Sequence, residues 1–236
     1  MHTYVIAEVG INHNGDIELA KELIHKAFIA GCDAVKFQKR DIESVYTQEE
    51  LDTPRESPFG TTTREQKEGI EFNIEQYKEL QAYAEELSLD FIVSCWDQMS
   101  LFQVEKHLDV KYHKVAVEYV LACTSTYPTA PEEVNLRYLE TLKRLYPNTK
   151  VGFSNHYNGM DACVGSVALG AECVEFHITK QRAMYGSDQA ASIQDVDDLC
   201  DAIRKMEVML GDGIKVVYDT EKPIAQKLRK VNNTVE

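Results

Sequence analysis

Short runs of β-forming residues alternate with amphipathic runs along almost the whole chain, and this alternation constrains the fold more than any other feature. Residues 4–9 and 32–38 are typical of strands, and residues 16–30 between them carry apolar side chains at helical spacing. The same pattern predicts strands at 90–95, 111–115, 119–123, 150–153 and 173–178, and helices at 74–87, 100–107, 132–146, 161–169 and 193–210. Strands that alternate with helices pair in parallel, so the chain is predicted to be an α/β protein.

Polar residues gather where these strands end, and this placement favours a (β/α)8 TIM barrel over a doubly wound sheet. A barrel carries its site on the rim formed by the C-terminal strand ends, whereas a doubly wound sheet concentrates polar groups at one switch point. Glu8, Lys36, Lys114, His156 and His177 all occupy such ends. No GxGxxG or P-loop pattern occurs. We predict one catalytic domain over residues 1–236, with a C-terminal tail from about residue 212.

The interval between two predicted strands departs from this alternation. The centres of the strands at 111–115 and 119–123 lie too close together, because a parallel crossover needs at least about 10–12 residues. Only seven strands are predicted, where a barrel of this class has eight. The sequence therefore predicts that part of the barrel is absent between Lys114 and Tyr119.

The charge indicates which partners the protein is expected to avoid, and the cysteine content indicates its compartment. Against 25 Lys and Arg stand 39 Asp and Glu, a net charge of −14, which disfavours nucleic acid and anionic membranes. No apolar run is long enough to span a bilayer, and no secretory signal precedes the first predicted strand. The six cysteines include no CxxC pair and lie mostly in apolar segments, so we expect free thiols and a cytoplasmic protein.

His156 and His177 end consecutive predicted strands, and a barrel would place them side by side. Two neutral imidazoles there suit a divalent metal ion with open positions for substrate and water. Glu8 ends the first strand, beside the strand of His177, and would be a general base or a partner of metal-bound water. A structural role for either histidine, and a structural ion pair for Glu8, are the alternatives.

Lys36 and Lys114 lie within strands, where a lysine is costly unless it is paired or used. In a chain of charge −14, two inward lysines indicate a site for phosphate or carboxylate. Ser125 and Ser154 would donate to the same anion. A buried salt bridge is the alternative interpretation.

Several motifs together resemble one family. Ile6-Ala-Glu-Val-Gly-Ile-Asn-His-Asn-Gly15, Val35-Lys-Phe-Gln38, Cys123-Thr-Ser-Thr-Tyr-Pro-Thr129, Gly152-Phe-Ser-Asn-His156, Glu175-Phe-His177 and Gly186-Ser-Asp188 are similar, in order, to motifs of the N-acetylneuraminate (sialic acid) synthase family. The resemblance implies a barrel enzyme that condenses phosphoenolpyruvate with an N-acetylhexosamine such as N-acetylmannosamine, with Mn²⁺ or Mg²⁺. It also implies a nine-carbon 2-keto-3-deoxy acid as product, release of phosphate, and a homodimer.

The resemblance also assigns roles by position. It makes Glu8, His156 and His177 the catalytic residues, with the two histidines as metal ligands. It assigns the phosphoenolpyruvate contacts to Lys36, Lys114, Ser125 and Ser154, and the sugar contacts to Gln38, Tyr127 and Asp188.

Three departures accompany the resemblance. Asn155 stands where the family often has Asp, and Cys95 stands where related enzymes have Thr. Many members also carry a C-terminal antifreeze-like domain, which we do not expect here. The family has a site turn, a fifth strand and another helix after the strand of Lys114, and about 45 such residues are missing if eight units share about 250 residues.

Two other functions stay open at this point. A metal-dependent sugar aldolase or isomerase on the same barrel would not need phosphoenolpyruvate. A non-catalytic remnant that binds sugar phosphates would account for the missing segment. We expect the Cα–Cα step between Lys114 and Tyr119 to exceed the ~3.8 Å of a trans peptide if the segment is present in the molecule.

Overall fold

The computed structural model describes residues 2–110, 112–113, 119–186 and 188–228. Strands and helices alternate in it, as the periodicity predicts. The main sheet contains β1 (Tyr4–Gly10), β2 (Ala34–Lys39), β5 (Asp90–Cys95), β6 (Tyr112–His113), β7 (Tyr119–Cys123), β8 (Lys150–Asn155) and β9 (Cys173–His177). The helices that follow these strands are α1 (Ile17–Ala30), α5 (Ile74–Glu86), α6 (Gln98–His107), α7 (Tyr138–Leu145), α8 (Asp161–Ala168) and α9 (Val196–Leu210).

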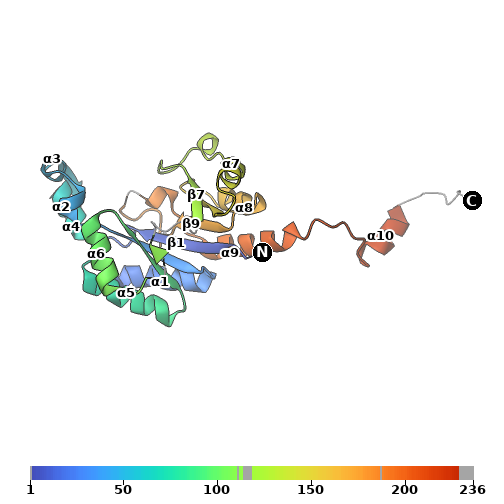
Figure 1. Ribbon diagram of the computed structural model, residues 1–236, viewed down its shortest axis with the longest axis horizontal. Coiled ribbons are helices and arrows are strands. Elements are labelled where there is room, and N and C mark those ends of the chain that lie inside the picture. Colours follow the sequence, from blue (N-terminus) through green and yellow to red (C-terminus); the bar gives the residue numbers. More distant parts are fainter. Residues whose placement is uncertain (1, 111, 114–118, 187, 229–236) are drawn as a thin grey trace, which may run out of the picture.

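The sheet is parallel and curled, with the order β6-β5-β2-β1-β9-β8-β7 (Figure 1). The first strand therefore pairs with the last, as it does in a barrel, and consecutive strands are neighbours on either side of β1. The sequence predicts a closed barrel, but in the part of the chain described here β6 and β7 are the two ends of the sheet. The predicted break between Lys114 and Tyr119 falls on residues 114–118, outside the described residues.

The outer face of the sheet packs against the helices because alternate strand residues are apolar. Val5, Ala7 and Val9 of β1 are fully buried there, together with Leu23 and Ile24 of α1. Each buried side chain of the size of Val or Leu contributes about 1.5–3 kcal/mol to folding. This contiguous cluster fixes the position and direction of β1, β2, β5 and β9.

The inner face begins with an apolar layer and continues with charged residues. Ile6, Ala34, Ile92 and Cys173 form a second buried cluster inside the curl. Residues two apart on a strand share a face, so the side chains that follow on this face, toward the C-terminal strand ends, are Glu8, Lys36, Ser94 and Glu175. The apolar layer is thus the floor of the polar region.

The chain between β2 and α5 is folded, whereas the sequence predicts only a polar excursion. It contains α2 (Ile42–Val45), α3 (Gln48–Leu51), the antiparallel pair β3 (Pro54–Ser57) and β4 (Gly60–Thr62), and α4 (Thr63–Ile70). Capping boxes at Thr47 and Thr62 start α3 and α4. The ring of Phe59, at the hairpin, meets the ring of Tyr185 in the loop after β9, with centroids 6.4 Å apart. This segment therefore reaches across the end of the sheet.

The helix predicted over residues 132–146 is shorter than expected. The structure has a 3₁₀ turn, η1 (Pro131–Glu133), and α7 begins only at Tyr138. Asn135 between them has φ of +46°, a left-handed conformation that interrupts a right-handed helix. Apolar periodicity alone does not reveal such a break.

The last helix, α10 (Glu221–Leu228), lies away from the body of the molecule at the end of an extended arm (Figure 1). Its apolar residues Ile224 and Leu228 are exposed. The predicted tail corresponds to this arm. Among the described residues no helix has both the length and the apolar character needed to cross a bilayer.

Candidate active site

A buried lysine between two carboxylates forms the centre of the site. Nζ of Lys36 lies 2.5 Å from Glu8 Oε2 and 2.5 Å from Glu175 Oε2. The exposed fractions are 3% for Lys36, 1% for Glu8 and 4% for Glu175. Strand register brings them together, since Glu8 on β1 is the partner of Lys36 on β2. Among the described residues, one ammonium thus faces two carboxylates in a buried trio.

Glu8 offers an oxygen that could act on a substrate. Its Oε1 is buried and has no hydrogen-bond partner among the described residues. A buried carboxylate oxygen without a donor is costly to maintain, which makes it a candidate functional group. Glu175 differs, because its Oε1 accepts a hydrogen bond from Ser154 Oγ at 3.0 Å. Glu8 is therefore the better placed of the two to accept a proton.

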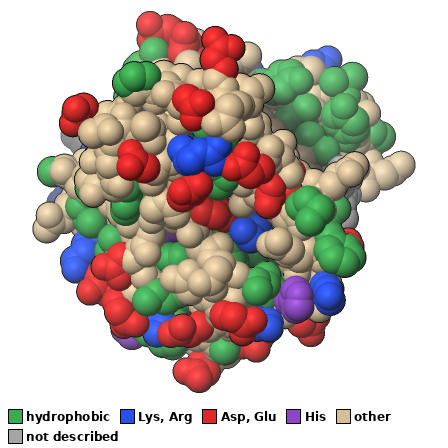
Figure 2. All heavy atoms as spheres, turned by 90° about the vertical axis from the view of Figure 1, so that its left-hand side faces the viewer, with side chains coloured by type: hydrophobic (Ala, Val, Ile, Leu, Met, Phe, Trp, Pro, Cys, Tyr) green, Lys and Arg blue, Asp and Glu red, His purple; other side chains and the backbone are tan. Residues whose placement is uncertain are grey.

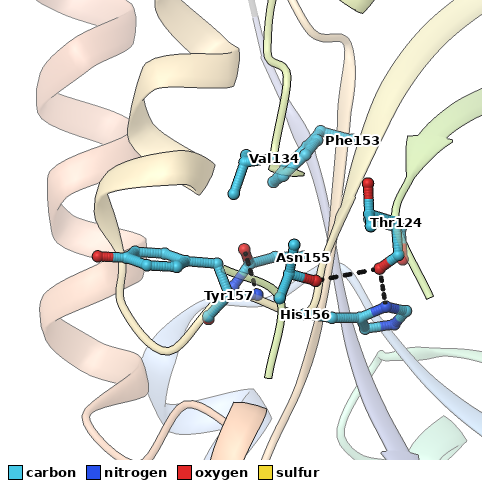
Figure 3. A pocket seen from close by; sticks show the side chains of 8 residues that line it. Thr124, Val134, Phe153, Asn155, His156 and Tyr157 are labelled. Carbon is cyan, nitrogen blue, oxygen red and sulfur yellow. Dashed lines mark hydrogen bonds between the residues drawn. The ribbon is translucent and has the colours of Figure 1, made fainter. Parts of the chain in front are cut away.

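His156, directly after β8, is held by the chain that follows β7. Its Nδ1 lies 2.7 Å from the carbonyl oxygen of Thr124 (Figure 3) and 3.8 Å from Cys123 Sγ. Because a carbonyl oxygen only accepts, Nδ1 carries the proton and Nε2 keeps its lone pair. Burial lowers the pKa of His156, but the contacts with Cys123 and Thr124 outweigh it and leave this pKa above its ordinary value.

His177 ends β9 and lies beside His156. The two ring centroids are 5.3 Å apart, with an angle of 52° between the planes. Tyr127 packs against both rings, with centroid distances of 4.1 Å to His156 and 5.5 Å to His177. Asp188, directly before the turn η2 (Gln189–Ala191), places Oδ2 3.4 Å from Nδ1 of His177. An acceptor near Nδ1 of each imidazole is the arrangement that orients histidine ligands in metal sites.

The pair of histidines fits a divalent ion that takes its remaining ligands from substrate and water. One imidazole is held at Nδ1 by the Thr124 carbonyl, the other has Asp188 3.4 Å from its Nδ1, and both offer a nitrogen donor to such an ion. Within residues 2–110, 112–113, 119–186 and 188–228, no third His, Cys, Asp or Glu completes a ligand cluster. The structure thus brings together the two histidines predicted as ligands.

The other predicted site residues fall into four groups by position. Ser154, Tyr127 and Asp188 belong to the cluster just described. Gln38 lies on the same side of β2 as Lys36, two residues further along. Ser125 is exposed and lies 3.8 Å from Cys123 Sγ, at the outer border of the site. Lys114 lies outside the described residues.

Sequence reasoning missed or underrated four contributors. Glu175 is an equal partner of Lys36, and its position two residues before His177 was the available signal. Thr124 and Cys123 hold His156 through a backbone carbonyl and a thiol, which no side-chain pattern reveals. The fourth is Arg40, whose guanidinium covers the ring of Trp96 at 4.0 Å.

The site faces the end of the molecule toward which the strands run. Figure 2 looks onto this end and shows acidic side chains around Lys or Arg side chains near the centre of the face. Beneath His156, a cavity of about 10 Å³ is lined by Thr124, Phe153 and Asn155, among others (Figure 3). It has room for about one water molecule.

Comparisons with known proteins identify the family of the chain. The NeuB family model matches residues 23–120 and 117–215. N-acetylneuraminate-9-phosphate synthase of Mus musculus is 32% identical over 275 residues, covering 96% of this chain and 76% of the mouse protein. N,N'-diacetyllegionaminic acid synthase of Legionella pneumophila is 30% identical over 283 residues, covering 98% of this chain and 79% of that protein.

A solved structure shows the same fold. The N-acetylneuraminic acid (sialic acid) synthetase of Leptospira borgpetersenii, crystallised with citrate, superimposes with a TM-score of 0.76 at 22% identity. The match covers 98% of this chain and 94% of that structure. Together with the family model and the relatives, this settles the family that the sequence motifs predict. The chain belongs to the NeuB family, the family of the sialic acid synthases.

Proposed function

We propose that this protein is a nonulosonic acid synthase, a transferase that condenses phosphoenolpyruvate with an N-acylhexosamine and releases phosphate. The observation that carries the proposal is the buried Glu8–Lys36–Glu175 trio beside the imidazoles of His156 and His177. The two relatives described above are named as synthases of N-acetylneuraminate-9-phosphate and of N,N'-diacetyllegionaminic acid, and these names support the reaction class.

The reaction joins C3 of phosphoenolpyruvate to the aldehyde carbon C1 of the open-chain sugar. The cation that develops at C2 takes up water, and the tetrahedral intermediate loses phosphate by cleavage of its C2–O bond. The carboxylates of the trio would stabilise the cation electrostatically. Glu8 Oε1 would accept the proton of the water that adds at C2, because it has no hydrogen-bond partner among the described residues.

A divalent ion, Mn²⁺ or Mg²⁺, would be held by His156 and His177. When bound, it would polarise the sugar aldehyde for attack. The contribution of the chain is to fix both rings, through Thr124 at His156 and Asp188 at His177.

The substrate contacts follow the inner face of the sheet. Lys36 and Ser154, with Ser125 and Lys114, would bind the anionic groups of phosphoenolpyruvate. Lys36 is fully engaged by carboxylates here, so binding would exchange one carboxylate contact for a substrate oxygen. Gln38, Tyr127 and Asp188 would contact the sugar. The name of the mouse relative gives a phosphorylated product and that of the Legionella relative an unphosphorylated one. Both a phosphorylated and an unphosphorylated sugar are therefore candidate substrates.

We further propose that the architecture is a (β/α)8 barrel that lacks about one and a half units between β6 and β7. The strand order supports this proposal, as does the alignment with the mouse protein, which runs over 275 positions and so has 39 more than the chain has residues. The two segments of the family match also meet at residues 117–120. This gap is the observation that favours a second candidate, a remnant that binds sugar phosphates without turnover.

Oligomeric state and compartment are predictions as well. The resemblance to the family supports a homodimer, which light scattering after gel filtration would measure. All six cysteines are free in the structure, and this supports a reducing compartment such as the cytoplasm.

One experiment separates the two candidates. Purified protein is incubated with phosphoenolpyruvate, Mn²⁺ and a panel of N-acylhexosamines and their 6-phosphates, and released phosphate is measured. A synthase releases phosphate only when a suitable sugar is present. Binding of a sugar without phosphate release would favour the remnant.

A further inference from the structure

The inner face of β2 continues beyond the site into a cation–aromatic pair. Arg40 follows β2 directly and is only 8% exposed, although it lies at the end of a strand. Its guanidinium carbon lies 4.0 Å from the ring centroid of Trp96, which follows β5 and is 53% exposed. The backbone N–H of Trp96 donates to Lys39 O at 3.0 Å, which fixes the two chain segments beside each other.

Arg40 lies in line with the residues proposed for catalysis. Lys36, Gln38 and Arg40 are two residues apart, and such residues share a face of a strand. A hydrogen bond from Nη2 of Arg40 to Oε1 of Gln38 confirms that Arg40 lies on this side. The order from the floor of the site outward is therefore Lys36, the sugar-binding candidate Gln38, and Arg40.

Glu71 is the carboxylate that Arg40 shares with Lys39. Glu71 accepts hydrogen bonds from Lys39 Nζ at 3.2 Å and from the backbone N–H of Arg40 at 3.2 Å. Its other oxygen is 4.0 Å from Nη1 of Arg40, beyond hydrogen-bond distance. One carboxylate thus faces two cations, which leaves about one positive charge in a chain of charge −14. Nε of Arg40 is buried and has no hydrogen-bond partner among the described residues.

This chemistry suits a phosphate monoester on a sugar. A guanidinium held against an aromatic ring presents N–H groups in its own plane, and phosphate accepts such paired bonds better than a hydroxyl does. The sugar aldehyde must lie near the histidines, so its far end points away from them. Phosphoenolpyruvate supplies three carbons, so C6 of a hexosamine becomes C9 of the product and is the atom farthest from the bond that forms.

We infer that Arg40, held by Trp96 and Gln38, binds a phosphate group at C6 of the hexosamine and makes the protein selective for hexosamine 6-phosphates. The inference rests on the proposed function for the orientation of the sugar. Arg40 is then a specificity-determining residue that takes no part in the bond-forming steps.

Calorimetric titration tests this without turnover. N-acetylmannosamine 6-phosphate and N-acetylmannosamine are titrated into the wild type, Arg40→Met, Arg40→Lys and Trp96→Leu. Loss of a charge-assisted contact lowers affinity about 10- to 150-fold, so Arg40→Met should weaken binding of the phosphorylated sugar by that factor. Its affinity for the unphosphorylated sugar should change less than about threefold. Arg40→Lys keeps the positive charge but lacks the paired N–H groups of a guanidinium. Its affinity for the phosphorylated sugar should therefore lie between those of the wild type and Arg40→Met.

Steady-state kinetics provide a second readout. In Arg40→Met, KM for the phosphorylated sugar should rise while kcat at saturation is kept, because the contact is the same in ground and transition states. Arg144→Met, which removes a charge from exposed α7, is the matched control and should leave both constants unchanged. Circular dichroism and the melting temperature verify folding. If Arg40→Met does not fold, Arg40→Lys and Trp96→Leu carry the test.

The outcomes separate this inference from the proposed function. Equal losses for both sugars would make Arg40 a structural support and overturn the inference, as would unchanged affinity for the phosphorylated sugar. Selective, Arg40-dependent binding in a protein that releases no phosphate from phosphoenolpyruvate would support the inference and refute the proposed function.

Discussion

The two halves of the candidate site differ in charge. On β1, β2 and β9, Lys36 is enclosed by Glu8 and Glu175 and shielded almost completely from water. At the ends of β8 and β9, His156 and His177 contact each other and Tyr127 and contain no fixed charge when the imidazoles are neutral. The first half is a buried ionic unit, and the second is a set of oriented donors.

This difference predicts different consequences of mutation. A buried ion pair whose partner is removed leaves an uncompensated charge, so the ionic half should affect folding as well as function. Removing a neutral imidazole leaves no uncompensated charge, so the histidine half should affect function more than folding, although both rings are buried. The following predictions test this contrast, from the largest expected effect to the smallest.

His156→Ala should abolish metal-dependent phosphate release, and it should lower the free energy of unfolding less than Lys36→Met does. The side chain is a proposed ligand; it is buried, but it leaves no unpaired charge behind when removed. Activity assays with Mn²⁺ and urea unfolding measure the two effects. His25→Ala, on the exposed face of α1, is the control. Full activity in His156→Ala would disprove the ligand assignment.

Lys36→Met should destabilise the protein by about 3–5 kcal/mol, because two buried carboxylates then face each other without a cation. Urea unfolding measures this. The double variant Lys36→Met, Glu175→Gln should recover part of the loss. Lys21→Met breaks ion pairs to Glu18 and Glu79 at the surface and should show no resolvable change. A loss below about 1 kcal/mol in Lys36→Met would mean that the ionic half is not a structural unit.

A third imidazole, His13 in the β1–α1 loop, sharpens the comparison because it is buried against apolar rings. It stacks on Phe72 with centroids 4.1 Å apart, and its Nδ1 accepts the N–H of Gly15 at 3.1 Å. Burial lowers the pKa of His13 to about 3, although a hydrogen bond with the backbone of Gly10 opposes the shift. In the unfolded chain His13 therefore binds a proton below about pH 6.5, whereas in the folded chain it binds one only below about pH 3.

Stability should thus fall as the pH drops through this window, by up to about 1.4 kcal/mol per pH unit from His13. His13→Asn keeps an acceptor for Gly15 and should remove this part of the slope between pH 6 and pH 4. Urea unfolding across that range measures the difference from the wild type, with His25→Asn as the surface control. Parallel curves for His13→Asn and the wild type would contradict a neutral, buried His13.

Asp188→Asn should give the smallest effect, a loss of about 10- to 100-fold in Mn²⁺ affinity with unchanged folding. The carboxylate lies 3.4 Å from Nδ1 of His177, where it would orient the ring of a proposed ligand. Calorimetric titration of Mn²⁺ alone measures this effect without turnover. Unchanged affinity would leave Asp188 with only its proposed role as a sugar contact.

The sequence by itself determined the parallel α/β class, the face on which Glu8, Lys36, His156 and His177 lie, and the family. The first two features follow from local periodicity, because alternation along a strand decides which side of the sheet a residue occupies. The family follows from the resemblance of the motifs. The same periodicity missed the interruption at Asn135 and the small helices and hairpin of the segment after β2.

Only the tertiary structure decided which groups meet across strands. The register that pairs Glu8 with Lys36 and with His177 arises from packing of the whole sheet on its helices, and no single segment contains it. Packing therefore enclosed Lys36 between two carboxylates instead of leaving it as an open anion site, and it placed Arg40 on Trp96. The physical reason is that periodicity assigns each side chain to a face, whereas its partners depend on residues far away in the chain.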